Sequence, residues 1–137
     1  MSQMPAIQTI LAKAGLRPTA KRVALAKLLF DGVDKHVTAD DVMEMVRRKR
    51  LRVSQATVYN SLNQFCAAGL LKRIVIDSSS TVFDTNTSHH HHLFYEDDGH
   101  IVDLAGDSIS LLGLPDLAEH ESLLSVDLML RVGRAHD

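Results

Sequence analysis

The chain has 137 residues, of which 45% are hydrophobic, and a formal net charge of −2 at pH 7. No apolar run approaches the length that crosses a bilayer, and residues 1–15 lack the basic start and long apolar block of a signal peptide. These features predict a cytoplasmic protein, and the single cysteine, Cys66, agrees with a reducing compartment.

Charge is divided unevenly along the chain. Residues 1–75 hold 13 of the 15 Lys and Arg but only five acids, whereas residues 76–137 hold two cations and 12 acids. This division predicts two modules, which we place at residues 1–85 and 86–137, with the basic module facing a polyanion. Two well-solvated surfaces would explain the charge equally well, so the residue pattern has to decide between the two.

Four short helices are predicted in the first module. Apolar residues at helical spacing predict a helix that ends at Gly15, and the hydroxyls of Thr19, Thr38 and Ser54 can each cap a further helix. The apolar residues expected to face inward are Val23, Ala26, Leu29, Val42, Met45, Val46, Val58, Leu62 and Phe65. Residues 70–77 and 81–85 then predict two strands around a serine turn. Helices followed by such a hairpin are typical of a winged helix.

The fourth helix, residues 54–65, is expected to expose a polar surface. The residues expected to face outward carry short hydrogen-bonding groups: Gln55, Thr57, Tyr59, Asn60, Ser61 and Asn63. Such groups can address base edges, while a basic flank neutralises phosphates. That flank consists of Arg47, Arg48, Lys49, Arg50 and Arg52. Each residue alone fits an ordinary solvent-facing position, but together they favour DNA binding.

Four consecutive histidines, residues 89–92, lie at the start of a predicted strand. Successive side chains of a strand point to opposite faces, so His90 and His92 share one face and His89 and His91 share the other. One short strand can therefore offer two histidines to each of two separate sites.

The second module is predicted to hold a hairpin, a helix and a closing strand. The hairpin strands are residues 93–96 and 100–104, the helix runs from Pro115 to Leu124, and the strand covers residues 125–132. So small a core favours pairing with a second copy, and a two-fold homodimer predicts a palindromic operator. The expected fold class is α+β.

Several motifs resemble the ferric uptake regulator family. They are LAKAGLRPTAKRVALAKLL, HVTADDVMEMV, SQATVYNSLNQFCAAGLLKR and HHHHLFYEDDGHIVDL. The resemblance implies a DNA-binding winged helix followed by a metal-sensing α/β dimerisation domain. TVYN, together with a histidine run that lacks cysteines, is most similar to the iron response regulator branch, whose members are bacterial repressors that answer to haem.

The resemblance also implies a sensory metal site. Its ligands would be His36, Asp84, His90 and His92, a set that suits Zn²⁺, Fe²⁺ or Mn²⁺. Because these ligands come from both modules, the bound metal would couple its own presence to DNA affinity through the hinge between them.

A second metal or haem site is implied on the opposite face of the histidine strand. It would use His89 and His91 with Asp127, although the usual acid of the family falls at Ser110, a poor ligand. The same histidines could instead hold haem axially. The cysteine pair of many relatives is replaced by Tyr95 and Asp98, so a structural zinc is not expected. Cys66 is expected in the core.

The predicted function is a homodimeric repressor, not an enzyme, that answers to metal or haem and controls iron-homeostasis genes. Tyr59 and Asn60 should touch bases, Ser54 and Thr57 the backbone, and Lys13 a phosphate or minor groove. A zinc-, manganese- or peroxide-responsive regulator of the same family is an alternative. A metal-dependent hydrolase or oxygenase is another, but no general base is evident beside an open coordination position. A histidine-rich metal store would leave the reader helix unexplained.

Overall fold

A computed structural model describes residues 6–133 of the chain. The chain divides into two compact units, Met1–Thr87 and Ser88–Asp137. Within the described residues, the first unit contains four helices and one three-stranded sheet, and the second contains another three-stranded sheet. Over the same residues, no helix combines the length and apolar character needed to cross a membrane.

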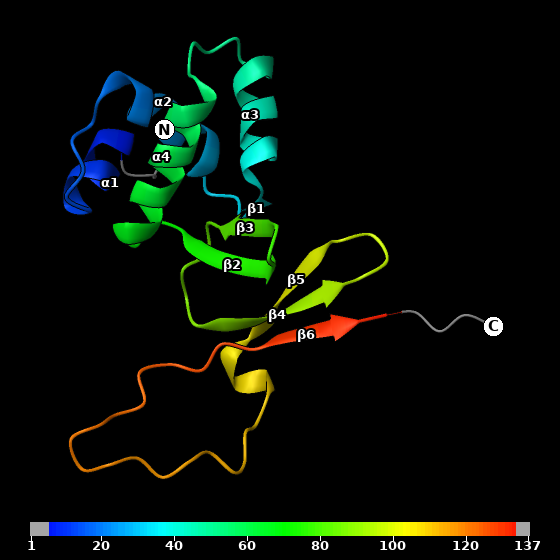
Figure 1. Cartoon of the computed structure of the whole chain (residues 1–137). Coiled ribbons are helices and arrows are strands. Elements are labelled where there is room, and N and C mark those ends of the chain that lie inside the picture. The colour runs from blue at the N-terminus through cyan, green and yellow to red at the C-terminus, as the bar shows by residue number, and fades with distance from the viewer. Residues whose placement is uncertain (1–5, 134–137) are drawn as a thin grey trace. The chain divides into compact units, whose positions relative to one another are not determined.

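Over its described residues, the first unit contains four helices, and three of them begin where the hydroxyl caps predict. The four are α1 (Ile7–Lys13), α2 (Ala20–Leu29), α3 (Ala39–Arg48) and α4 (Gln55–Ala67) (Figure 1). Thr19, Thr38 and Ser54 each accept a hydrogen bond from the backbone N–H three residues further on, which satisfies a donor that the helix itself leaves unpaired. Thr38 also forms a reciprocal capping box with Asp41. The predicted caps are confirmed.

The core of the first unit orients α4, the predicted reader helix. Val58, Leu62 and Phe65 of α4 are at most 1% exposed, and Phe65 meets Phe30 edge to face, with ring centroids 5.7 Å apart. Each such burial stabilises the fold by about 1.5–3 kcal/mol. The fully buried part of this cluster also includes Leu11, Leu25, Ala26, Leu29 and Val42. The inward face of α4 is therefore fixed, and its opposite face remains at the surface.

The sheet of the first unit forms the wing. Its strands are β1 (His36–Val37), β2 (Lys72–Asp77) and β3 (Ser80–Asp84), arranged in the order β1-β3-β2 with both pairings antiparallel. β2 and β3 form the hairpin predicted from the sequence. Because β1 pairs with β3, residue 36 lies directly opposite residue 84. The α+β class with a winged-helix unit is confirmed.

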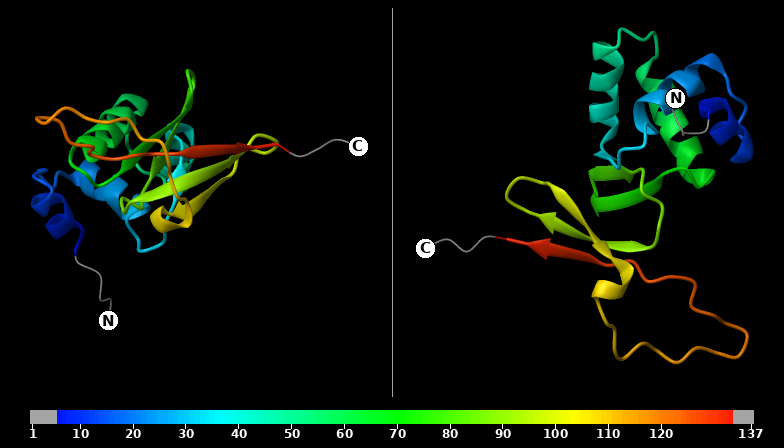
Figure 2. Two further views of the ribbon diagram at one scale, coloured as in Figure 1. Left: turned by 90° about the horizontal axis from the view of Figure 1, so that it is seen from below. Right: turned by 180° about the vertical axis from the view of Figure 1, so that it is seen from behind.

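The second unit is built around the histidine strand. β4 (His90–Tyr95) lies between β5 (Ile101–Ala105), which is antiparallel to it, and β6 (Met129–Val132), which is parallel to it (Figure 2). A 3₁₀ turn, η1 (Gly106–Ser108), follows β5. β4 begins three residues earlier than the predicted hairpin strand, so most of the histidine run takes part in the sheet.

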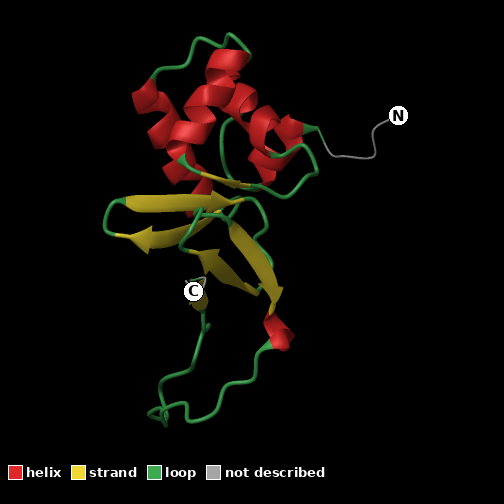
Figure 3. Cartoon of the chain, turned by 90° about the vertical axis from the view of Figure 1, so that its right-hand side faces the viewer, coloured by secondary structure: helices red, strands yellow, loops and turns green. Residues whose placement is uncertain are grey.

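The helix predicted from Pro115 to Leu124 is wrong. Residues 109–128 contain neither helix nor strand (Figure 3). A helix of ten residues is marginal in water unless an apolar face packs against a partner. Leu117 is 47% exposed and Leu124 is 91% exposed, so packing does not supply that support.

Candidate metal centre and nucleic-acid interface

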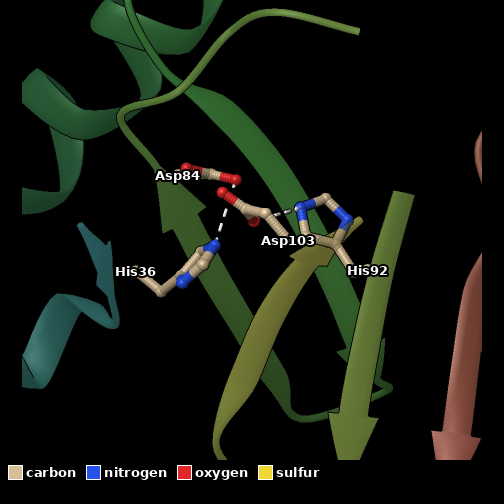
Figure 4. Close-up of side chains that lie close together, drawn as sticks. All are labelled: His36, Asp84, His92 and Asp103. Atoms are coloured by element: carbon tan, nitrogen blue, oxygen red, sulfur yellow. Dashed lines mark hydrogen bonds and ion pairs between the residues drawn. The ribbon is translucent and has the colours of Figure 1, made fainter. Parts of the chain in front are cut away.

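The first unit holds one pair of metal-type ligands, His36 and Asp84. Cross-strand pairing brings His36 Nε2 to 3.2 Å from Asp84 Oδ2 (Figure 4). The Asp84 side chain is fully buried, and its other oxygen, Oδ1, accepts the backbone N–H of Asn86 at 2.9 Å. Two backbone-anchored bonds between Lys35 and Thr85 hold the ends of the same strands together. The carboxylate is thus aimed at the imidazole by local structure alone.

The second unit holds three further ligands on one face of its sheet. Asp103 Oδ1 lies 3.3 Å from His90 Nε2 and 3.5 Å from His92 Nε2, and the two rings have centroids 4.5 Å apart (Figure 4 draws His92 and Asp103). The strand register places Asp103 directly across from His92. Sequence reasoning paired these two histidines but missed Asp103. Two imidazoles and a carboxylate on one face are typical ligands of divalent transition metals.

The ring of His90 is held in the tautomer that a metal requires. Its Nδ1 lies 2.6 Å from the carbonyl oxygen of Ser88, which can only accept a hydrogen bond. Nδ1 therefore carries a proton, and in the neutral form of the ring Nε2 keeps a lone pair that can bind a metal. An imidazole whose second nitrogen donates to a backbone carbonyl is the usual arrangement of metal-ligating histidines.

The opposite face of β4 carries His89 and His91, the histidines of the predicted second site. His91 Nδ1 accepts the backbone N–H of Leu128 at 3.3 Å, so its lone pair is already engaged and the neutral ring carries its proton on Nε2. His89 is exposed, with its ring centroid 5.3 Å from that of His91. Within residues 6–133, His89, His91 and Asp127 do not form a group of three potential ligands.

The exposed face of α4 carries Tyr59 and Asn60, the two predicted base contacts. Tyr59 is 44% exposed, and Asn60 is also exposed. Ser54 Oγ accepts the Thr57 N–H at 3.1 Å and donates to Thr57 Oγ1 at 2.9 Å, so these two hydroxyls are joined at the start of the helix. The expectation that Ser61 faces outward is wrong: it is 4% exposed, because it falls on the same side of the helix as the buried core positions.

The predicted phosphate contacts Arg47 and Arg48 lie at the end of α3. Both side chains are more than two-thirds exposed, and each pairs with Glu44 at 3.4 Å. Exposed pairs of this kind contribute at most about 1 kcal/mol, so a phosphate can compete for either guanidinium.

A groove lined by cations follows one side of α4. Arg17, Lys21 and Arg22 line it together with Thr57, Asn60 and Gln64. The Arg22 guanidinium donates to Gln64 Oε1 at 2.9 and 3.1 Å and to the Arg17 carbonyl oxygen at 3.1 Å, which ties the start of α2 to α4.

Sequence reasoning did not select these three cations as DNA contacts. It selected Lys13 as the cation that contacts a phosphate or minor groove. Lys13 is exposed but does not line this groove. The signal was the stretch GLRPTAKR, in which cations bracket the cap of α2. Cys66, on the same helix as the reader residues, is half-buried, and burial raises the pKa of its thiol, in agreement with a place at the edge of the core.

The fold and the ligand pattern together define a winged-helix protein whose second unit carries an imidazole–carboxylate cluster. Residues 13–127 match the ferric uptake regulator family, and the chain belongs to that family.

Relatives and solved structures agree with this assignment. The peroxide-responsive repressor PerR of Staphylococcus epidermidis is 39% identical over 68% of this chain and 61% of that protein. The ferric uptake regulation protein of Escherichia coli K12 is 34% identical over 82% of this chain and 76% of its own length. A structure of the Pseudomonas aeruginosa ferric uptake regulator with manganese has a TM-score of 0.73 and 25% identity, and the match covers 96% of this chain and 100% of that chain.

The matched region is only part of some relatives. It makes up 61% of the S. epidermidis protein and 60% of the Pseudomonas fluorescens ferric uptake regulation protein. This chain therefore spans less than two thirds of their length.

Proposed function

We propose that this protein is a metal-responsive transcriptional repressor that binds a palindromic operator as a cytoplasmic homodimer and controls iron-homeostasis genes. The observation that carries the proposal is the presence of oriented metal-type ligands in both units. The winged-helix unit contributes His36 and Asp84, and the second unit contributes His90, His92 and Asp103. A DNA-binding unit has no evident need for such ligands unless an ion regulates it.

The donor set fits a divalent ion. Three imidazoles and two carboxylates suit Mn²⁺, Fe²⁺ or Zn²⁺, and the ligand types alone do not choose among them. Asp84 Oδ2 is oriented by the Asn86 amide, and His90 Nε2 by the Ser88 carbonyl. An ion that takes ligands from both units would restrict the angle between them. Metal occupancy would then shift the population of the DNA-binding arrangement.

Replacing His90 tests this mechanism, with His89 as the matched control on the same strand. His90→Ala should lower both the manganese content after equilibrium dialysis and the affinity for operator DNA measured by fluorescence anisotropy. His89→Ala removes an exposed imidazole from the opposite face and should leave both quantities near those of the unmodified protein. Unchanged metal-dependent DNA affinity in His90→Ala, with strict chelation as the baseline, would contradict the mechanism.

A peroxide-responsive repressor is the second candidate. The relative PerR carries that description, and the second carboxylate, Asp103, makes the ligand set hard enough to hold redox-active Fe²⁺. Peroxide should then abolish operator binding by protein loaded with Fe²⁺ while sparing protein loaded with Mn²⁺. Equal sensitivity in the two forms would argue against this candidate.

Haem response rests on the resemblance to the iron response regulator branch. The motif TVYN and the histidine run carry that resemblance. An axial ligand needs a lone pair, and the Leu128 amide already engages that of His91, which leaves His89 as the better candidate on that face. Titration with haem, followed by the absorbance of the Soret band in the wild type and in His89→Ala, tests this part of the proposal.

A further inference from the structure

A second cavity lies on the other side of α4 from the groove that contains Arg17. It has a volume of about 400 Å³ and lies within the winged-helix unit, between α4, the wing and the start of α3. Tyr59 and Asn63 line it from α4, and Arg73, Ser80 and Thr81 line it from the wing. The groove and the cavity thus flank α4 on two sides.

Arg73 is the cation of this cavity. Its guanidinium donates to Asn63 Oδ1 at 2.5 Å and lies 5.9 Å from the centroid of the Phe83 ring. A guanidinium has five N–H donors, and the Asn63 amide oxygen engages one of its nitrogens. Arg73 forms no ion pair with any residue in the range 6–133. The side chain is therefore held in place while most of its hydrogen-bonding capacity is still available to a ligand.

DNA geometry requires a polar partner on each side of a reader helix. The major groove is about 12 Å wide, and a helix with its side chains is about 10–12 Å across, so a helix in the groove has one phosphate backbone along each side. Arg17, Lys21 and Arg22 lie along one side of α4. The cavity that holds Arg73 lies along the other side.

We propose that this cavity binds a backbone phosphate of the DNA strand that runs along the wing side of α4. Arg73 supplies the positive charge, and the hydroxyl of Thr81 supplies a further donor. Asp40 also lines the cavity and repels the same phosphate, so its charge weakens the interaction. This inference rests on the proposed DNA-binding function and adds a contact that the reader helix and basic flank do not include.

Salt dependence of DNA binding provides the test, because each phosphate contact contributes to the slope of log K against log[salt]. The probe is a short duplex selected from a random pool by the wild-type, Mn²⁺-loaded protein. Arg73→Gln removes the charge but keeps an amide that can donate to Asn63. It should reduce the magnitude of the slope by about 0.9, whereas Arg73→Lys should retain the slope. Asp40→Asn removes a negative charge from the cavity and should therefore increase the affinity for the duplex.

Lys72→Ala is the matched control, since Lys72 precedes Arg73 on β2 and its side chain leaves the opposite face of the strand. It does not line the cavity and should change the slope by less than half as much. Equal slopes for the wild type and Arg73→Gln would overturn the phosphate site while leaving the proposed repressor intact. Failure of the wild type to select any duplex would instead remove the proposed function. If thermal melting shows that Arg73→Gln is unfolded, the affinity of Asp40→Asn for the duplex tests the phosphate site instead. Tighter binding by Asp40→Asn supports the site, and unchanged binding overturns it.

Discussion

Arg50 adopts a backbone conformation that normally belongs to glycine. Its φ is +55°, and among residues 6–133 it is the only non-glycine residue with positive φ. It follows α3, where the N–H of Arg50 donates to the Arg47 carbonyl at 3.0 Å and the N–H of Leu51 donates to the Val46 carbonyl at 3.0 Å. This pair of bonds is the helix-ending motif in which glycine is the usual residue.

Arg50→Gly should therefore stabilise the winged-helix unit. The left-handed conformation costs an L-residue about 1–2 kcal/mol, and glycine avoids this cost. Glycine's greater chain entropy in the unfolded state offsets about 0.5–1 kcal/mol of that gain. The net gain is about 0.5–1 kcal/mol. For a unit of this size, such a gain raises the melting temperature by about 2–8 °C.

Thermal unfolding followed by circular dichroism measures this gain, with Arg50→Ala as the control. Arg50→Ala removes the same charge but keeps a Cβ in the left-handed region, so it should not gain stability. A melting temperature of Arg50→Gly at or below that of Arg50→Ala would refute the strain argument. Because the residue belongs to the basic flank, both variants should bind DNA more weakly and by a similar factor. That outcome would explain why arginine occupies a glycine position.

Three further outcomes are expected. Gly106→Ala would place a Cβ 2.4 Å from His89 Cδ2. Calorimetry should therefore show that the free energy of unfolding falls by about 1 kcal/mol, and a second substitution, His89→Ala, should restore it. Cys66 should react slowly with iodoacetamide near pH 7.5, because burial raises its pKa and lowers the thiolate fraction; a rate equal to that of free cysteine would contradict this. Tyr59→Ala should weaken operator binding more than binding to random duplex in a mobility-shift titration, and equal losses would mean that Tyr59 does not read bases.

Local signals were sufficient to predict the winged-helix unit. A hydroxyl cap followed by apolar residues at helical spacing depends on contacts within a few residues, and Thr19, Thr38 and Ser54 all cap helices as predicted. The helix predicted from Pro115 also rested on a local start signal, in this case a proline in the first turn. It lacks a surface to pack against, which no local pattern reveals. A start signal therefore predicts a helix only where the fold also supplies burial.

Register explains why Asp103 was missed. The predicted strands, residues 93–96 and 100–104, leave a three-residue turn, and pairing directly across that turn would place residue 104 opposite His92. The observed turn is one residue longer than the predicted turn. Phe94 therefore pairs with Ile101, and His92 pairs with Asp103. A shift of one residue moves every side chain to the other face of a strand. The face shared by His90 and His92 was predictable from alternation alone, but their carboxylate partner depended on the turn.

Alternation also does not determine which histidines can bind a metal. Neighbouring residues of β4 differ in the backbone group that meets Nδ1: the carbonyl of Ser88 accepts from His90, whereas the amide of Leu128 donates to His91. In a neutral ring, the first contact leaves Nε2 with a lone pair, whereas the second leaves Nε2 with a proton. Two adjacent imidazoles are thus prepared for opposite roles by hydrogen bonds that the sequence pattern does not encode. This difference favours the face that contains Asp103 as the metal-binding face and gives the His91 ring a structural role, joining β4 to the residue that precedes β6.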